Sequence, residues 1–435
     1  MLKQVRKETP DLELLRKFIE KLSLDGLLRN VPVPEEQGVG YAVNKYNATH
    51  PYKIGGELLS KARWFELTEN QRSKDPEHTK LVDRIYFEGK ISKDDIFSYQ
   101  HLSPADFSSP DSPWLSASII CSTNRERLTL THHAAIRYAR AKGKLVYRWP
   151  AVHSKWEGAP HSDAGEVFED PCLYEYFVAG AHGFITDRVC FASNLVNATP
   201  VEYHTLSIDD PDDLLVIQSS LPHCVAGDIV TLTCPPFAIN VKIDACGKHK
   251  DLFTDFQRAY LKTKSIAKDN TIVIPIAPGT TKSTERVLVH GGHSFPPSRL
   301  KVSPHFPLEL GFAITVNKAQ GRTIDNVILA LSEKPMKIIN MGLKELYVAM
   351  SRVTQKANIR LLLNGKNNLD KYCSLDYVDT LEEDFSIRAF FHGYSLGGAG
   401  DWQNDQWDEK KALDFFVQHM DKIYGKAGCR KLKHR

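Results

Sequence analysis

Hydrophobic and polar positions follow their most regular pattern in the last third of the chain, after Gly311. Apolar runs at 312–316, 327–331 and 359–363 have the length and composition of buried strands. Between the second and third runs, apolar side chains recur three and four positions apart over 343–353, which is helical spacing. Strands that alternate with a helical segment predict a parallel α/β sheet.

The predicted helix at 343–353 has two faces. We expect its buried face to carry Leu343, Leu346, Tyr347 and Met350. Arg352 follows Leu343 after about 900° of rotation and therefore points the other way, and Glu345 lies within about 20° of Arg352. We expect this carboxylate and this guanidinium to face a cleft or water. An exposed ion pair, worth under about 1 kcal/mol, is the alternative.

The preceding two thirds of the chain are less regular. A strand is predicted within 114–124 and a helix after it, whereas 150–300 reads as short strands with long loops, a β segment at 227–243 and an acidic turn at 207–215. Toward the N-terminus, the pattern predicts a helix that is capped by Thr9 and begins at Pro10, a short strand at 64–67, and a helix that buries Leu81, Ile85 and Tyr86. A C-terminal amphipathic helix is predicted on Leu413, Phe416, Val417, Met420 and Tyr424.

The domain prediction follows from these breaks. Residues 1–101 are expected to be the remainder of a first domain with connecting helices, and the Ser-, Pro- and Asp-rich stretch 102–113 a linker. A second domain is expected over 114–375, with a β-rich insertion at about 235–300. Residues 376–435 would form a C-terminal helical segment.

Composition adds mainly exclusions. The 435 residues are 42% hydrophobic and 25% charged, which suits a globular protein of two or three domains. The eight cysteines contain no CxxC pair, so no metal site is predicted. No apolar run approaches the roughly 18 residues of a membrane helix, and no membrane partner is expected. The net charge of +3 does not by itself indicate nucleic-acid binding.

Local charge is more informative. The segment 122–148 contains a single acidic residue, Glu126, against Arg125, Arg127, Arg137, Arg140, Lys142, Lys144 and Arg148. Polar residues also crowd the end of the run at 312–316, namely Asn317, Lys318, Gln320, Gly321 and Arg322. Ligands of open α/β sheets bind at the carboxyl ends of strands. Gly321 would allow close backbone approach to an anion, so we predict a phosphate-handling surface here.

Several segments together resemble the Pif-type DNA helicases of superfamily 1 and their Helitron-transposon relatives. The stretch "FAITVNKAQGRTIDNVILALS" with "LKELYVAMSRV" and "IRLLL" is similar to their motifs V and VI. Further similar segments are "FELTENQRSKDPEH", "IICSTNRER" and "LPHCVAGDIVTLT". The resemblance runs from about Ala62 to Leu363. It implies a RecA-like (P-loop NTPase) lobe with a parallel sheet, an inserted β module and C-terminal helices.

The resemblance also implies roles for individual residues. Arg352 and Arg72 would be catalytic arginines that contact the γ-phosphate of ATP, and Gly321, Gln320 and Glu345 would help to bind the nucleotide. Single-stranded DNA would contact Asn124, Arg125, Arg127, Thr315, Asn317, Lys318 and Arg322. ATP and Mg²⁺ are the implied cofactors.

The sequence departs from the family pattern in places. Asn317 and Ala319 stand where the family usually has His and often Ser, and no GxxxxGK[ST] loop occurs in the sequence. The nearest decoy, "APGTTKST", lacks the glycine before its lysine. We therefore expect ATP and Mg²⁺ to bind only together with a separate or upstream RecA-like lobe, and the chain alone to be inactive.

Two other functions stay open at this stage. One is a non-catalytic nucleic-acid-binding remnant of a helicase or mobile element, and the other is a domain with no DNA role, in which the basic helix is ordinary surface. The basic tail "KAGCRKLKHR" is either a nuclear signal or a solvated terminus. The expected location is the nucleus, with the mitochondrion as the alternative.

Overall fold

The computed structural model describes residues 63–64, 73, 75–153, 170–267, 269, 271–279, 284–287, 299–331, 340–363, 375–381, 405–406, 411 and 414–415. The chain divides into two compact units, of which the second comprises 73–86 and 91–380. In the first unit, β1 (Arg63–Trp64) pairs with β17 (Asp405–Gln406) in antiparallel fashion. The predicted N-terminal helix lies outside the described residues, as does most of the predicted C-terminal helix.

A four-stranded parallel sheet forms in the second unit. Its strands are β14 (Ala313–Thr315), β2 (Ser118–Cys121), β15 (Val327–Ala330) and β16 (Ile359–Leu362), in that order. All three pairings are parallel. Every residue of β2 and β15 is buried, as expected for strands that are covered on both faces. The predicted α/β class with a parallel sheet is confirmed.

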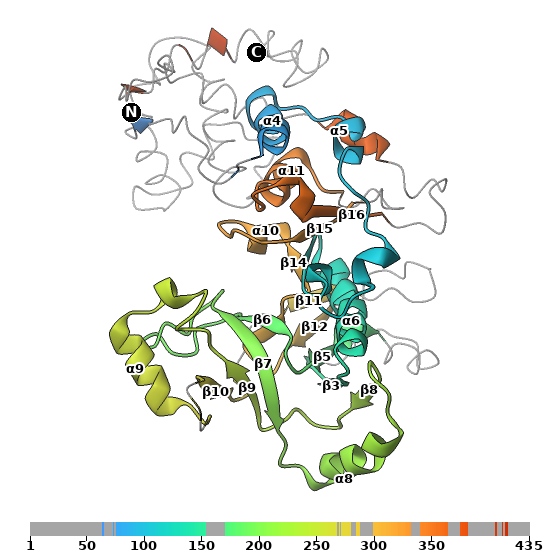
Figure 1. The fold of residues 1–435 in the computed structure, drawn as a ribbon, viewed down its shortest axis with the longest axis vertical. Coiled ribbons are helices and arrows are strands. Elements are labelled where there is room, and N and C mark those ends of the chain that lie inside the picture. The colour runs from blue at the N-terminus through green and yellow to red at the C-terminus, as the bar shows by residue number, and fades with distance from the viewer. Residues whose placement is uncertain are drawn as a thin grey trace, which may run out of the picture. The chain divides into compact units, whose positions relative to one another are not determined.

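Helices follow these strands directly. Helix α6 (Asn124–Ala141) begins after β2, where the Thr123 hydroxyl accepts a hydrogen bond from the Glu126 amide at 3.2 Å. It packs on β2 and β14 through the small buried residues Ala134, Ala135 and Ala139. The one-turn helix α10 (Val316–Ala319) follows β14 and contacts α11 (Leu343–Met350). Figure 1 labels these elements.

Antiparallel sheets occupy the middle of the chain. A five-stranded sheet has the order β10 (Val273–Ile276), β9 (Ala238–Lys242), β7 (Pro200–Ser207), β6 (His182–Ile185) and β13 (Leu308–Leu310), with β7 as its long central strand in Figure 1. Two three-stranded sheets consist of β5 (Tyr174–Phe177), β3 (Val146–Pro150) and β8 (Ile229–Thr231), and of β11 (Thr284–Val287), β12 (Arg299–Ser303) and β4 (Val152–His153). The β structure therefore extends well beyond the insertion predicted at 235–300.

One core joins the parallel and antiparallel sheets. Strand β13 runs into β14 through Gly311 and Phe312, and Phe312 is fully buried against Tyr138 of α6 with ring centroids 5.2 Å apart. On β6, a Cβ at Gly183 would lie 2.4 Å from the Tyr203 ring, so only glycine fits there. The backbone therefore runs from the five-stranded sheet directly into β14, the strand that precedes the polar residues 317–322.

The predicted linker 102–113 lies inside the second unit rather than between units. Its Leu102 amide donates to the Leu361 carbonyl at 2.8 Å, and its Asp106 pairs with Arg360 at 3.2 Å. Phe107 packs against the main core. The Pro- and Ser-rich composition reflects the turns η4 (Pro104–Phe107) and η5 (Pro113–Leu115), whose caps are serines. Composition alone did not reveal these long-range contacts.

Two further expectations are wrong. The acidic turn at 207–215 is the start of helix α8 (Pro211–Ser220), because the Asp210 carboxylate caps the amides of Asp212 and Asp213. Tyr86 is 45% exposed, since it lies in the π-helix η3 (Arg84–Glu88), where the chain no longer follows the α-helical spacing of α4 (Pro76–Asp83). The remaining described helices are α5 (Lys93–Phe97), η7 (Pro171–Leu173), η8 (Leu221–His223), η9 (Lys250–Leu252), α9 (Asp255–Lys264), η10 (Lys356–Asn358) and η12 (Asp376–Thr380).

Candidate nucleic-acid interface

The polar stretch after β14 is a short helix and a glycine turn. The strand ends at Thr315, and α10 buries Val316 and Ala319 while Asn317 is exposed and Lys318 partly exposed. Gly321 has φ of +80°, a left-handed conformation that favours glycine, and nothing lies within 4 Å of a Cβ built there. Gln320 is exposed beside it. The strand-end position is as the sequence predicts, whereas the predicted close approach of an anion to Gly321 stays a prediction.

A single carboxylate links two of the predicted DNA-binding cations. Lys318 Nζ lies 2.5 Å from Glu309 Oε1, and Arg127 Nη1 lies 3.0 Å from Glu309 Oε2. Glu309 belongs to β13, Lys318 to α10 and Arg127 to α6. The side chains of Glu309 and Arg127 are only 13% and 11% exposed, so water screens this pair weakly. The fold thus brings together cations that are far apart in the sequence.

These groups line a pocket of about 390 Å³. Asn124 lies beside Arg127 in its wall, with Asn124 Oδ1 3.4 Å from Arg127 Nε. Other side chains in the lining are the aromatic residues Trp149, Tyr174, Tyr176, Tyr203 and Phe306 and the polar residues Thr131, Glu175, Thr186, Asp187 and Asn197. Because α6 follows β2 and α10 follows β14, the pocket lies near the carboxyl ends of two parallel strands, where ligands of such sheets bind.

The structure places the other predicted contacts elsewhere. The Arg322 guanidinium lies 3.9 Å from the centroid of the Phe184 ring, and burial lowers the pKa of Arg322. Arg125 Nη2 lies 3.5 Å from Asp170 Oδ2. Thr315 is half-buried at the end of β14. Arg322 is therefore held against the protein by a cation–π contact, while Asn317 remains open to solvent.

The expectation that Arg352 faces a cleft or water is wrong. The helix ends at Met350, and the Arg352 residue is 7% exposed. Its Nε donates to the Val348 carbonyl at 2.7 Å, its Nη2 to Ser351 Oγ at 2.6 Å, and its Nη1 to the Arg322 carbonyl at 3.3 Å. In return the Ile324 amide donates to the Arg352 carbonyl at 2.9 Å. Arg352 thus ties the turn after α10 to the end of α11.

The remaining predicted nucleotide-binding residues are not joined by the described contacts. Glu345 is exposed on α11, and its Oε2 would lie 2.6 Å from a Cβ at Gly342, so the side chain folds back over the helix start. Arg72 lies outside the described residues. The predicted buried face of α11 is confirmed for Leu343, Leu346 and Met350.

Sequence reasoning missed Glu309 and Phe184. Glu309 is flanked by the buried Leu308 and Leu310, an alternation that predicts a strand with the carboxylate on its opposite face. Its partners could not be read from that pattern. Among the described residues, no cluster of His, Cys, Asp or Glu could hold a metal ion. No described helix is long and apolar enough to cross a membrane.

Comparison with known proteins shows what this region is similar to. The family profile of the viral superfamily 1 RNA helicase core domain matches residues 223–361. The ATP-dependent DNA helicase Pif1 of Campylobacter jejuni is 28% identical over 147 residues, which cover 34% of this chain and 30% of that protein. Residues 223–361 of this chain are thus similar to superfamily 1 helicases, and a Pif1 helicase is among the relatives of the chain. The stretches that resemble motifs V and VI, 312–332 and 343–353, lie inside the matched range.

Solved Pif1 structures are also similar to this chain. The Bacteroides Pif1 bound to single-stranded DNA is 15% identical with a TM-score of 0.43, and the match covers 88% of this chain and 72% of that chain. The Candida albicans Pif1 helicase is 16% identical with a TM-score of 0.40, with 74% of this chain and 58% of that chain covered. Another Bacteroides Pif1 structure, in complex with ADP-AlF3 and single-stranded DNA, is 15% identical with a TM-score of 0.40, over 83% of this chain and 63% of that chain. The chain thus spans about a third of the curated relative that it matches and less than two thirds of the Candida albicans structure.

Proposed function

We propose that this chain is the part of an ATP-dependent DNA helicase that binds the backbone of single-stranded DNA and couples its movement to ATP hydrolysis. ATP and Mg²⁺ would bind together with a separate or upstream RecA-like lobe that supplies a glycine-rich phosphate loop. Cycles of ATP binding and hydrolysis would drive translocation along the strand and duplex unwinding. The chain without such a lobe is expected to be inactive as an ATPase.

The observation that carries this proposal is the convergence of Arg127, Lys318 and Asn124 on one pocket at the carboxyl ends of β2 and β14. Cations and an amide in one wall suit a row of phosphates and carry no base specificity. The exposed Asn317 adds a further amide on the same short helix as Lys318.

Glu309 would act as the internal competitor of the DNA phosphate. In the structure its two carboxylate oxygens pair with Lys318 and Arg127. A phosphate that binds the same cations must take over these charge-assisted interactions. Because Lys318 is 39% exposed and Arg127 only 11%, Lys318 is the group that solvent and a phosphate reach first.

Arg352 would position rather than contact the nucleotide in the conformation described. Its hydrogen bonds connect the Arg322 carbonyl, next to the DNA-facing helix α10, with the Val348 carbonyl of α11. A shift of the turn after α10 would thereby move the end of α11, and the reverse. To contact the γ-phosphate, Arg352 would first have to break these hydrogen bonds.

The test is binding of a fluorescein-labelled oligo(dT) followed by anisotropy over a range of salt concentrations. For the intact chain we expect log Kd to depend linearly on log salt, with a slope set by about 0.7 per neutralised phosphate. Lys318→Ala and Arg127→Ala should each weaken binding and flatten that slope by about one contact. Lys262→Ala, an exposed lysine on α9, is the matched control and should change neither.

Glu309→Gln sharpens the same experiment. Removing the carboxylate while keeping the side-chain shape should tighten oligo(dT) binding by about threefold to tenfold, because the phosphate no longer displaces an ion pair. Unchanged binding in Lys318→Ala and Arg127→Ala would overturn the proposed interface. If the chain binds DNA as expected but, fused to a RecA-like lobe with a phosphate loop, shows no DNA-stimulated ATP hydrolysis, then a non-catalytic nucleic-acid-binding role replaces the helicase.

A further inference from the structure

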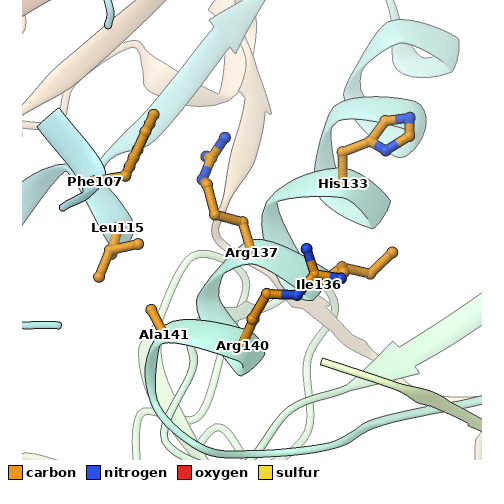
Figure 2. A pocket seen from close by; sticks show the side chains of 7 residues that line it. All are labelled: Phe107, Leu115, His133, Ile136, Arg137, Arg140 and Ala141. Atoms are coloured by element: carbon orange, nitrogen blue, oxygen red, sulfur yellow. The ribbon is translucent and has the colours of Figure 1, made fainter. Parts of the chain in front are cut away.

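A second pocket lies at the C-terminal half of α6. Its volume is about 490 Å³, and its walls come from α6, η4 and η5. The residues that line it are Phe107, Leu115, His133, Ile136, Arg137, Arg140 and Ala141. Figure 2 shows the Arg137 side chain extending from α6 toward Phe107. The pocket combines an apolar lining with three nitrogen-bearing side chains, and none of its lining residues carries a carboxylate.

Arg137 is the unusual group in this pocket. Its guanidinium carbon lies 4.0 Å from the centroid of the Phe107 ring, so its position is set by a cation–π contact. Its Nε is buried and has no hydrogen-bond partner among the described residues. A buried donor without an acceptor is unfavourable, and one on a cation more so. An anion in the pocket would stabilise the guanidinium charge through its Nη donors, because the buried Nε presents no surface to a ligand.

Two carboxylates close in sequence to the residues of η4 and η5 already have partners among the described residues. Asp106, next to Phe107 in the sequence, pairs with Arg360 at 3.2 Å, and Asp111 pairs with Lys142 at 3.2 Å. Arg140 packs beside Gly227, where a Cβ would lie 3.2 Å from Arg140 Nε. Neither carboxylate therefore pairs with Arg137 or Arg140.

The pocket faces away from the proposed DNA interface. At about 100° per residue, the α6 residues that line this pocket centre about 160° from those that line the first pocket, Asn124, Arg127, Leu128 and Thr131. One strand of DNA lying along Arg127 would thus have to wrap around α6 to reach Arg137. The two pockets are suited to different ligands.

We propose that this pocket docks an acidic segment of a partner protein, with an Asp or Glu carboxylate paired to Arg137 and Arg140 and an adjacent apolar side chain against the half-buried Phe107 and Ile136. A guanidinium presents two parallel donors to a carboxylate, which suits this pairing. The apolar walls favour a peptide over a nucleic-acid backbone, since a phosphodiester brings no apolar group to cover them.

The probe is a fluorescein-labelled decapeptide that alternates Asp with Leu and Phe, and its binding to the full chain is followed by anisotropy. We expect saturable binding that weakens at least tenfold for Arg137→Gln and at least threefold for Arg140→Gln. Lys144→Gln removes one exposed charge just beyond the same helix and should change the affinity less than twofold. The same peptide with Asn for Asp should not bind. The peptide with Ala for Leu and Phe should bind at least fivefold more weakly.

Competition distinguishes the alternative ligands. Excess oligo(dT) or inorganic phosphate should not displace the peptide, and oligo(dT) affinity should be the same in Arg137→Gln. Displacement by either one, or loss of oligo(dT) binding in Arg137→Gln, would make the pocket a phosphate site and overturn the proposal. Absence of peptide binding by the intact chain would also overturn it. The unfolding temperature of Arg137→Gln is measured without peptide and is expected to equal or exceed that of the intact chain. This result excludes misfolding as the cause of a loss of peptide binding.

Discussion

Truncation of Arg352 tests the most consequential difference between sequence pattern and structure. If the side chain projected to solvent, as helical periodicity predicts, Arg352→Ala would change the free energy of unfolding by about 0.5 kcal/mol or less. The structure instead gives the guanidinium hydrogen bonds to the Val348 carbonyl at 2.7 Å, Ser351 Oγ at 2.6 Å and, more weakly, the Arg322 carbonyl at 3.3 Å.

The expected magnitude follows from these contacts. A hydrogen bond to a charged group contributes about 1.5–3 kcal/mol, and truncation also leaves its buried acceptors without a donor. Since only the first two bonds are short and the contacts share one side chain, we expect Arg352→Ala to lower the free energy of unfolding by about 2–4 kcal/mol. Arg352→Lys keeps the charge but not the fork of donors, so its loss should be intermediate.

The free energy of unfolding of each variant is measured by urea-induced unfolding that is followed by circular dichroism. Glu345→Ala is the matched control, because Glu345 is exposed on the same helix and should change stability within about 0.5 kcal/mol. If Arg352→Ala were as mild as Glu345→Ala, the guanidinium would not hold the turn after α10 to α11, and the positioning role assigned to it would be refuted.

Two further outcomes are expected. Met350 is fully buried on α11, so Met350→Ala should cost about 2–5 kcal/mol in urea unfolding, whereas Lys344→Ala on the exposed side should cost about 0.5 kcal/mol or less; equal effects would contradict the assigned helix faces. Burial, with smaller contributions from His133 and Arg148, lowers the pKa of His132 to about 4, below its ordinary value of 6.5. The unfolded chain then binds this proton more tightly, so the contribution of His132 to stability is complete above about pH 6.5 and is lost as the pH falls toward 4. His132→Gln should flatten the dependence of stability on pH in that window while the exposed His223→Gln does not, and an equally steep dependence in both would contradict the burial of His132.

The sequence alone determined the parallel sheet and the strand-end position of the polar residues. The runs that became β2 and β15 are buried at every position, because strands covered on both faces have no solvent side, whereas β16 contains Arg360 and alternates between buried and half-buried positions. The start of α6 was equally local, since the Thr123 cap and the Glu126 amide are three residues apart. The sequence drew attention to Gly321, but its left-handed dihedral angle was found only in the structure.

Only the tertiary structure decided what those residues contact. Helical periodicity extends α11 to Arg352, but the helix ends at Met350. The direction of the Arg352 side chain is therefore set by its contact with the Arg322 carbonyl and not by the helical rotation of 100° per residue. Glu309 meets Arg127 and Lys318 because β13 pairs with β6 while β14 pairs with β2, and such pairings join residues that no local pattern relates. The pocket at Arg137 likewise forms only because η4 and η5 lie beside α6. The Pro- and Ser-rich composition of that stretch predicts a linker, whereas in the folded chain Leu102 bonds to Leu361 and Asp106 pairs with Arg360.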